Sequence, residues 1–272
     1  MSTKHAERSD CPRRPTPSSL MNGDVHIWCA DMRERWLESV LHGLLSEEER
    51  IRASRFAFEE DRRRYVHAHG FLRMLLGRYL DCSPTSLQFM VGPNGKPCLL
   101  SKDETMRFNL SHARALVLCA FSRDREVGVD VEWRDHELSW RDVASYTCSK
   151  REQAILASMN GPAQIDTFYS WWTLKEAYVK AVGAGLTLPL NRIDVAGKCE
   201  WPVVDPADGD LRDPRWALFT LPLWSGYAGA LVTEGRDAKI LCFQWRWDSA
   251  AVPVIESATS CGERKDYHAH QS

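Results

Sequence analysis

The chain has 272 residues, of which 44% are hydrophobic and 26% are charged, and its formal net charge is -2. This composition supports a hydrophobic core and excludes a wholly disordered chain, while the lack of a basic excess argues against a nucleic-acid partner. No apolar run approaches the roughly 18–20 residues of a membrane span, and no secretory signal follows Met1. The sequence therefore predicts a cytoplasmic protein without a membrane partner.

The predicted elements begin after a polar tail, residues 1–20, which lacks hydrophobic periodicity and is expected to be disordered. Residues 24–29 alternate as a strand does, residues 33–43 have helical spacing, and a longer helical stretch follows Ser46. Ser46 and Glu49 have the spacing of a capping box, which supports a helix start at this point.

The second part of the chain again mixes helices and strands. Segments 114–121 and 126–133 are predicted to pair as strands, and helices are predicted at 149–158 and 164–182. Further strands are predicted near 215–221, 226–233 and 239–247, followed by a second polar and disordered tail at 251–272.

This order predicts an α+β fold with mainly antiparallel sheets, because the strands lie at hairpin distances within each half of the chain. Similar strand–turn–strand pieces at 115–132 and 227–247 further indicate a duplication. We therefore expect two similar halves, at 21–126 and 127–250. The nine cysteines include no Cys-x-x-Cys pair, which argues against a disulfide framework and a zinc site.

Two acidic residues interrupt the apolar strand predicted around 127–133. Because side chains alternate along a strand, Asp130 and Glu132 share one face, while Val129 and Val131 share the other. Two carboxylates on one face repel each other, and a divalent cation such as Mg²⁺ or Mn²⁺ would relieve that repulsion. The alternative is an edge strand whose acidic face lies in water.

A helix expected over 164–182 carries Glu176 and Lys180 four residues apart, so both side chains share a face. They form either a surface ion pair of little energetic value or a metal carboxylate beside a phosphate-binding ammonium. Further upstream, Ser111 and His112 form either a polar end to a strand or a cradle for phosphates. Their adjacency does not have the arrangement of a Ser–His catalytic pair.

Basic residues gather in two other places. Lys96 follows a glycine-containing turn without the spacing of a Walker A loop, and is either solvated or a phosphate contact. A helical stretch carries six arginines that either recognise phosphates or form a solvated face: Arg50, Arg52, Arg55, Arg62, Arg63 and Arg64. The acidic residues beside them argue against a nucleic-acid groove.

Three motifs occur in a specific order: FNLSHA at 108–113, VGVDVEW at 127–133 and WWTLKEAYVKAVGAGL at 171–186. Together with SEEERIRASRFAFEEDRRRYVHAHGFLRMLL at 46–76 and NGKP at 94–97, they resemble the 4'-phosphopantetheinyl transferases. The match in size is to the larger, monomeric Sfp-like type, which activates surfactin synthetase. The resemblance implies two similar α+β halves with the active site between them, and a monomer.

By this resemblance, three carboxylates would bind Mg²⁺, or Mn²⁺, together with the pyrophosphate of coenzyme A: Asp130, Glu132 and Glu176. Lys180 would contact a phosphate, and Glu152 would lie beside the reacting centre and assist deprotonation. The coenzyme A site would be lined by Arg52, Lys96, Asn109, Ser111 and His112, with Arg55 and Arg64 as further candidates. One departure from the family pattern is Glu49, which stands where some relatives carry a lysine.

The implied activity is the Mg²⁺-dependent transfer of 4'-phosphopantetheine from coenzyme A to a serine of an apo acyl or peptidyl carrier protein, with release of adenosine 3',5'-bisphosphate. The serine proton would go to Glu176, Glu152 or a metal-bound water. The residues alone leave two other classes open. One is a different Mg²⁺-dependent phosphoryl or nucleotidyl transferase, and the other is a non-enzymatic module whose arginine-rich helix binds a carrier protein or RNA.

Overall fold

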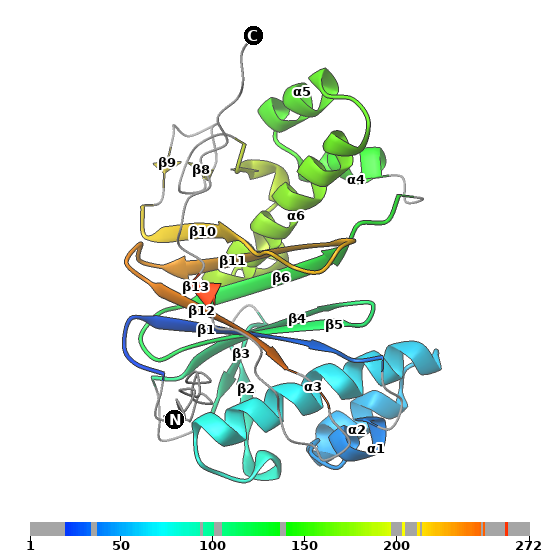
Figure 1. Ribbon diagram of the computed structural model, residues 1–272, viewed down its shortest axis with the longest axis vertical. Coiled ribbons are helices and arrows are strands. Elements are labelled where there is room, and N and C mark those ends of the chain that lie inside the picture. The colour runs from blue at the N-terminus through cyan, green and yellow to red at the C-terminus, as the bar shows by residue number, and fades with distance from the viewer. Residues whose placement is uncertain are drawn as a thin grey trace, which may run out of the picture.

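Two β-sheets lie face to face between two groups of helices, as Figure 1 shows. The computed structural model describes residues 20–33, 37–92, 95–100, 105–136, 140–196, 203–204, 211–212, 214–245, 247 and 259–260. This arrangement confirms the predicted α+β class. Within the described residues, no helix combines the length and the apolar composition that crossing a membrane requires.

Three helices cover the outer face of the first sheet: α1 (Leu37–His42), α2 (Glu47–Ser54) and α3 (Glu59–Tyr79). The strands of this sheet are β1 (Asp24–Asp31), β4 (Arg107–Ala113), β5 (Leu116–Ser122), β12 (Lys239–Trp245) and β13 (Thr259–Ser260), in the order β13-β12-β1-β5-β4. Phe71 of α3 packs with Trp28 and Phe121 of the sheet in one core. The predicted capping box is confirmed, since Ser46 and Glu49 each bond the other's backbone N–H at the start of α2.

The second sheet has the order β10-β11-β6 and is covered by the other helices. Its strands are β6 (Val127–Trp133), β10 (Trp216–Thr220) and β11 (Tyr227–Glu234), and its helices are α4 (Trp140–Thr147), α5 (Lys150–Ser158) and α6 (Pro162–Val182). The short elements are η2 (Pro84–Ser86), β2 (Phe89–Val91), β3 (Pro97–Leu99), η3 (Gly185–Thr187), η4 (Leu190–Arg192), β7 (Ile193–Asp194), β8 (Val203–Val204) and β9 (Leu211–Arg212).

Two predicted strand pairings are wrong, because in both cases the chain changes sheet at the turn. β5 pairs with β1 and β4, whereas β6, which follows it, pairs with β11. In the same way, β11 lies in the second sheet, while β12 pairs in parallel with β1 in the first. Alternation along a segment predicts a strand and its faces but not its partner. The segments predicted as two halves, 21–126 and 127–250, thus share the first sheet.

The predicted tails fall mostly outside the described residues. Leu20 is an exception, because its side chain is buried in the core and its carbonyl accepts a hydrogen bond from Arg123 Nε at 3.1 Å. Thr259 and Ser260 also lie in a predicted tail, yet they form β13 against β12. The prediction of disorder is therefore wrong for these three residues, whose backbone groups or side chains find partners in the folded domain.

Side chains take the place of backbone pairing where the two sheets meet. Asn109 Oδ1 accepts the backbone N–H of Val129 at 2.9 Å, and Ser111 Oγ accepts that of Val131 at 3.3 Å. Both acceptors come from β4 and both donors from β6. The side chains predicted for the site on these two strands are therefore held together at the seam between the sheets.

A glycine in β6 allows α6 to pack closely against this strand. A Cβ atom added at Gly128 would lie 2.1 Å from the carbonyl oxygen of Ala177 and 2.4 Å from the backbone nitrogen of Ala181, both in α6. Both obstacles are helix backbone, which cannot rotate away as a side chain can. Gly128 thus sets the distance between the strand that carries Asp130 and the helix that carries Lys180.

We expect Gly128→Ala to lower the free energy of unfolding by roughly 1–3 kcal/mol, because the added methyl group forces the helix off the strand. The change would be measured by urea unfolding followed by tryptophan fluorescence. Gly43→Ala is the matched control, since its Cβ would lie 3.3 Å from the nearest atom, the Val40 carbonyl oxygen. An equal loss in the two variants would contradict this account of the contact.

Candidate active site at the seam between the sheets

Asp130 is the most deeply buried member of the site, with 5% of its side chain exposed. Its Oδ1 accepts hydrogen bonds from Lys180 Nζ at 2.6 Å and from Ser111 Oγ at 2.9 Å, and Lys180 also donates to Ser111 Oγ at 3.0 Å. Burial raises the pKa of Asp130, and the charge of Lys180 and the bond from Ser111 offset part of that rise. Asp130 Oδ2 is also buried, but it has no hydrogen-bond partner in the described part of the chain.

Glu132 and Glu176 complete a group of three carboxylates around Lys180. Burial raises the pKa of Glu132 to about 7, and the negative charges of Asp130 and Glu176 add to this effect against the attraction of Lys180. The pKa of Glu176 is raised by burial and by Asp130, again against Lys180. Burial is the main cause of both shifts, and the repulsion predicted between carboxylates adds to it, since α6 brings a third one to the two of β6.

The donor set fits a hard divalent cation in its chemistry. Three carboxylates supply the oxygen ligands that Mg²⁺ and Mn²⁺ prefer, and Asp130 Oδ2 is a buried acceptor to which no described residue donates. In the described ranges, however, no three His, Cys, Asp or Glu side chains already converge as a metal site. In the present arrangement, the Lys180 ammonium occupies the other oxygen of Asp130.

A cationic cleft of about 390 Å³ opens beside this cluster. Its basic and imidazole side chains come from α3, from the β4–β5 hairpin and from the end of β1: Arg33, Arg63, Arg64, Arg114, His67 and His112. One acidic residue, Glu60, also lines it. The pKa of His112 is lowered, first by loss of hydration in the cleft and then by nearby cations that include Lys180 and Arg64. The cleft therefore has the charge and the donors to hold a phosphate ester.

The predicted arginines separate into two groups. Arg64 lines the cleft and pairs with Glu60 and Asp61 of its own helix. Arg52 lies with its guanidinium 5.6 Å from the Tyr65 ring centroid and is not among the residues that line the cleft, and the same holds for Arg55. Sequence reasoning missed Arg33 and Arg114 as cleft residues, although Arg114 follows His112 by only two positions.

Glu49 has a structural role that explains its departure from the family pattern. It accepts the Ser46 backbone N–H at 2.9 Å and Arg73 Nε at 2.5 Å, and it lies 3.5 Å from His69 Nδ1. These donors lower its pKa against the opposing effect of burial. The carboxylate is therefore used to join α2 to α3 through the buried Arg73.

Lys96 does not point a free ammonium at the cleft. Its Nζ donates to Glu126 Oε2 at 2.6 Å, to the Ala181 carbonyl at 2.9 Å and to the Val127 carbonyl at 3.1 Å. These partners are near the start of β6 and the end of α6. In this structure Lys96 joins those two elements, rather than lining an open coenzyme A site.

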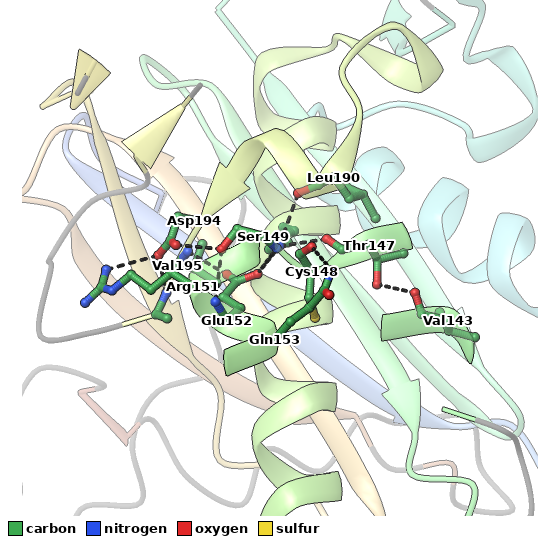
Figure 2. Close-up of polar contacts among 12 residues, drawn as sticks. Val143, Thr147, Cys148, Ser149, Arg151, Glu152, Gln153, Leu190, Asp194 and Val195 are labelled. Atoms are coloured by element: carbon green, nitrogen blue, oxygen red, sulfur yellow. Dashed lines mark hydrogen bonds and ion pairs between the residues drawn. The ribbon is translucent and has the colours of Figure 1, made fainter. Parts of the chain in front are cut away.

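Glu152 also differs from the expectation of a base beside the reacting centre. Its side chain is fully buried and pairs with Lys175 Nζ, which is likewise buried. Figure 2 shows the group, in which Glu152 lies among Ser149, Asp194 and Val195. Lys175 was missed from the sequence because a lysine in a helix is usually taken to face solvent.

Comparison with known proteins shows which family this chain matches. The protein-family model "4'-phosphopantetheinyl transferase, N-terminal" matches residues 28–123. A second family model, "4'-phosphopantetheinyl transferase superfamily", matches residues 126–203. The 4'-phosphopantetheinyl transferase HetI of Nostoc sp. is 35% identical over 212 residues, which cover 76% of this chain and 86% of HetI. The chain belongs to the 4'-phosphopantetheinyl transferase superfamily.

Other members of the superfamily extend the comparison. The transferase Sfp of Bacillus subtilis is 31% identical over 151 residues, covering 56% of this chain and 66% of Sfp. A holo-(acyl-carrier-protein) synthase of Bacillus anthracis, solved in complex with CoA (3',5'-ADP), aligns with 40% of this chain and 94% of its own length, at 18% identity and a TM-score of 0.32. That structural similarity is too remote to carry a further conclusion. The sequence matches confirm the predicted membership of the phosphopantetheinyl transferases.

The raised pKa of Glu132 predicts a pH dependence of stability in metal-free protein. Because the folded pKa of about 7 lies above the usual value of 4.5, the folded state binds more protons between these pH values, and stability falls as the pH rises through them. Glu132→Gln should therefore raise the free energy of unfolding at pH 8 by roughly 1–2 kcal/mol, after allowance for partial solvent exposure, and leave it unchanged near pH 4.

This effect would be measured by urea unfolding in EDTA at both pH values. Glu48→Gln, an exposed substitution in the first turn of α2, is the control. A Glu132→Gln protein that is no more stable than the parent at pH 8 would show that burial and the neighbouring carboxylates do not disfavour the charged form of Glu132 in the fold.

Proposed function

We propose that this chain transfers the 4'-phosphopantetheine arm of coenzyme A to a serine hydroxyl of an acyl or peptidyl carrier protein, in a Mg²⁺-dependent reaction. The observation that supports the site is the buried Asp130, whose Oδ2 finds no donor among the described residues and whose charge interacts with Glu132, Glu176 and Lys180. Membership of the phosphopantetheinyl transferase superfamily supports the reaction.

The reaction forms one P–O bond and breaks another. The serine oxygen attacks the phosphorus that bears pantetheine, the bond from this phosphorus to the bridging oxygen breaks, and adenosine 3',5'-bisphosphate leaves with the electron pair. The serine proton passes to a base on the enzyme. Such phosphoryl chemistry depends mainly on the positioning of the groups and on compensation of the developing charge.

The cluster at the seam supplies both of these contributions. Asp130, Glu132 and Glu176 would hold the Mg²⁺, which neutralises charge on the pyrophosphate when bound. Lys180 adds a second positive charge, since its ammonium lies 2.6 Å from Asp130 Oδ1. Glu176 is the carboxylate of the cluster that we assign to accept the serine proton, because Glu152 is buried elsewhere and paired with Lys175.

The cationic cleft would hold the nucleotide end of coenzyme A. Arg63, Arg64 and His112 line it and supply donors for the 3'-phosphate of the adenosine. Ser111 and Asn109 support the site, because Ser111 Oγ donates to Asp130 and Asn109 Oδ1 accepts a backbone N–H of β6. All these groups come from one chain, so a monomer suffices for the reaction.

The direct test incubates the protein with coenzyme A, Mg²⁺ and several apo carrier proteins, and weighs each carrier intact by mass spectrometry. We expect a mass gain of one phosphopantetheine, which is lost in EDTA. Asp130→Asn should slow the transfer by about a hundredfold, since it removes charge from the metal site. Asp142→Asn, on the exposed side of α4, is the control and should leave the rate unchanged.

Failure to modify any carrier, with folded protein and bound coenzyme A, would overturn the proposed transfer. Consumption of ATP in place of coenzyme A would instead identify a different Mg²⁺-dependent phosphoryl or nucleotidyl transferase. Binding of a carrier that survives both EDTA and Asp130→Asn, without any mass gain, would identify a binding module.

A further inference from the structure

A buried ion pair lies behind the active-site helix. The side chains of Glu152 in α5 and Lys175 in α6 are 0% and 1% exposed, and the ammonium of Lys175 donates to Glu152 Oε2. Two unlike charges in this environment depend on each other, because neither has water to replace the other.

Glu152 has no free oxygen with which to take a proton from a substrate. Its Oε2 also accepts the Ser149 backbone N–H at 2.8 Å, and its Oε1 accepts the Val195 backbone N–H at 2.9 Å. The carboxylate thus closes the capping box of α5 and binds the segment after η4, as the dashed lines of Figure 2 show. A base for the docked serine would need an oxygen that the serine can reach.

Lys175 joins two further parts of the fold at the same point. Its Nζ donates to the carbonyl of Thr147, at the end of α4, at 2.8 Å, and to the carbonyl of Leu190, in η4, at 3.1 Å. Beside it, Ser149 Oγ donates to Asp194 Oδ2 at 2.7 Å, which fixes the η4–β7 segment on the α5 N-terminus. One ammonium therefore connects α4, α5, α6 and η4.

α6 is held from two directions as a result. Gly128 of β6 lets the helix backbone approach at Ala177 and Ala181, whereas Lys175 anchors the helix to α4, α5 and η4. Glu176 follows Lys175 directly, and Lys180 lies five residues after Lys175 in the same helix. Any rotation or shift of α6 would move both of these site residues together.

We infer that Glu152 and Lys175 act as a single positioning unit, which fixes α6 and thereby sets Glu176 and Lys180 against Asp130. This assignment rests on the proposed function of the site. It gives Glu152 a role through Lys175 and α6, in place of a direct role as the base.

A double-variant cycle distinguishes a positioning role of the Glu152–Lys175 pair from a role of Glu152 as the base. In Glu152→Gln or Lys175→Met, the remaining charge is buried without its partner, and we expect the melting temperature to fall by roughly 10 °C. The double variant buries neither charge, so its melting temperature should lie above that of either single variant. Glutamine at position 152 also keeps the residue type that a capping box accepts.

Alkylation of Cys148 gives a second readout that needs no turnover. This thiol is buried beside the pair, and burial raises its pKa to about 11, so it should react slowly in the parent protein. Peptide-level mass spectrometry would follow its reaction with iodoacetamide. We expect faster alkylation in both single variants and a rate closer to the parent in the double variant.

Transfer kinetics test the positioning role itself. We expect each single variant to lower kcat by about tenfold, because a shift of α6 moves Glu176 and Lys180 together away from Asp130. The double variant should recover part of this kcat and keep the parent's pH–rate profile. If Glu152 is the base, Glu152→Gln and the double variant would be equally inactive, and the acidic limb of the profile would be lost.

The outcomes distinguish this inference from the proposed function. If the parent protein fails to modify carriers, the proposed transfer is wrong, but the thermal and alkylation measurements still test the ion pair. If the double variant is no more stable and no better protected at Cys148 than the single variants, Glu152 and Lys175 are not a unit, even when the parent enzyme is active.

Discussion

The close contact of α6 with β6 at Gly128 is the constraint on which the site depends. The Cβ of any other residue at this position would fall within the helix backbone, so the strand and the helix touch only because the side chain is absent. Asp130 follows Gly128 by two residues on the same face of β6, and Lys180 precedes the contact residue Ala181. The same contact that buries Asp130 therefore provides its counter-charge.

Burial of a carboxylate is costly unless the charge is compensated, and here the compensation is incomplete. Lys180 and Ser111 both bind Asp130 Oδ1, while Oδ2 has no donor among the residues that the structure describes, and Glu132 and Glu176 add further negative charge. Such a site is under electrostatic strain in the absence of a cation. The unbalanced negative charge is compatible with the divalent cation of the proposed reaction, and it distinguishes the cluster from the satisfied pair of Glu152 and Lys175.

The sheets also place the cluster beside the cationic cleft. β4 belongs to the first sheet and β6 to the second, and Asn109 and Ser111 join them through side-chain bonds. His112, the next residue of β4, lines the cleft. The cleft residue His112 and the site residue Ser111 are thus adjacent along β4.

The sequence predicts local features well, because they depend on neighbouring residues. Periodicity located α2, α3, α5, α6 and most of the long strands but not α4 or β4, the capping box at Ser46 was confirmed, and alternation placed Asp130 and Glu132 on one face of β6. Strand partners depend on distant segments, which explains why both predicted hairpins failed. The surroundings of Lys96 and Glu152 could not be predicted for the same reason, since their partners lie in other elements of the chain.

Direct measurement of Mn²⁺ binding by electron paramagnetic resonance tests, without turnover, whether the carboxylates at the seam hold a divalent cation. In the presence of coenzyme A, the protein should bind Mn²⁺ in a form that Mg²⁺ displaces. Asp130→Asn should weaken this binding by at least about tenfold, whereas Asp142→Asn should not change it. Unchanged Mn²⁺ affinity in Asp130→Asn would contradict the account.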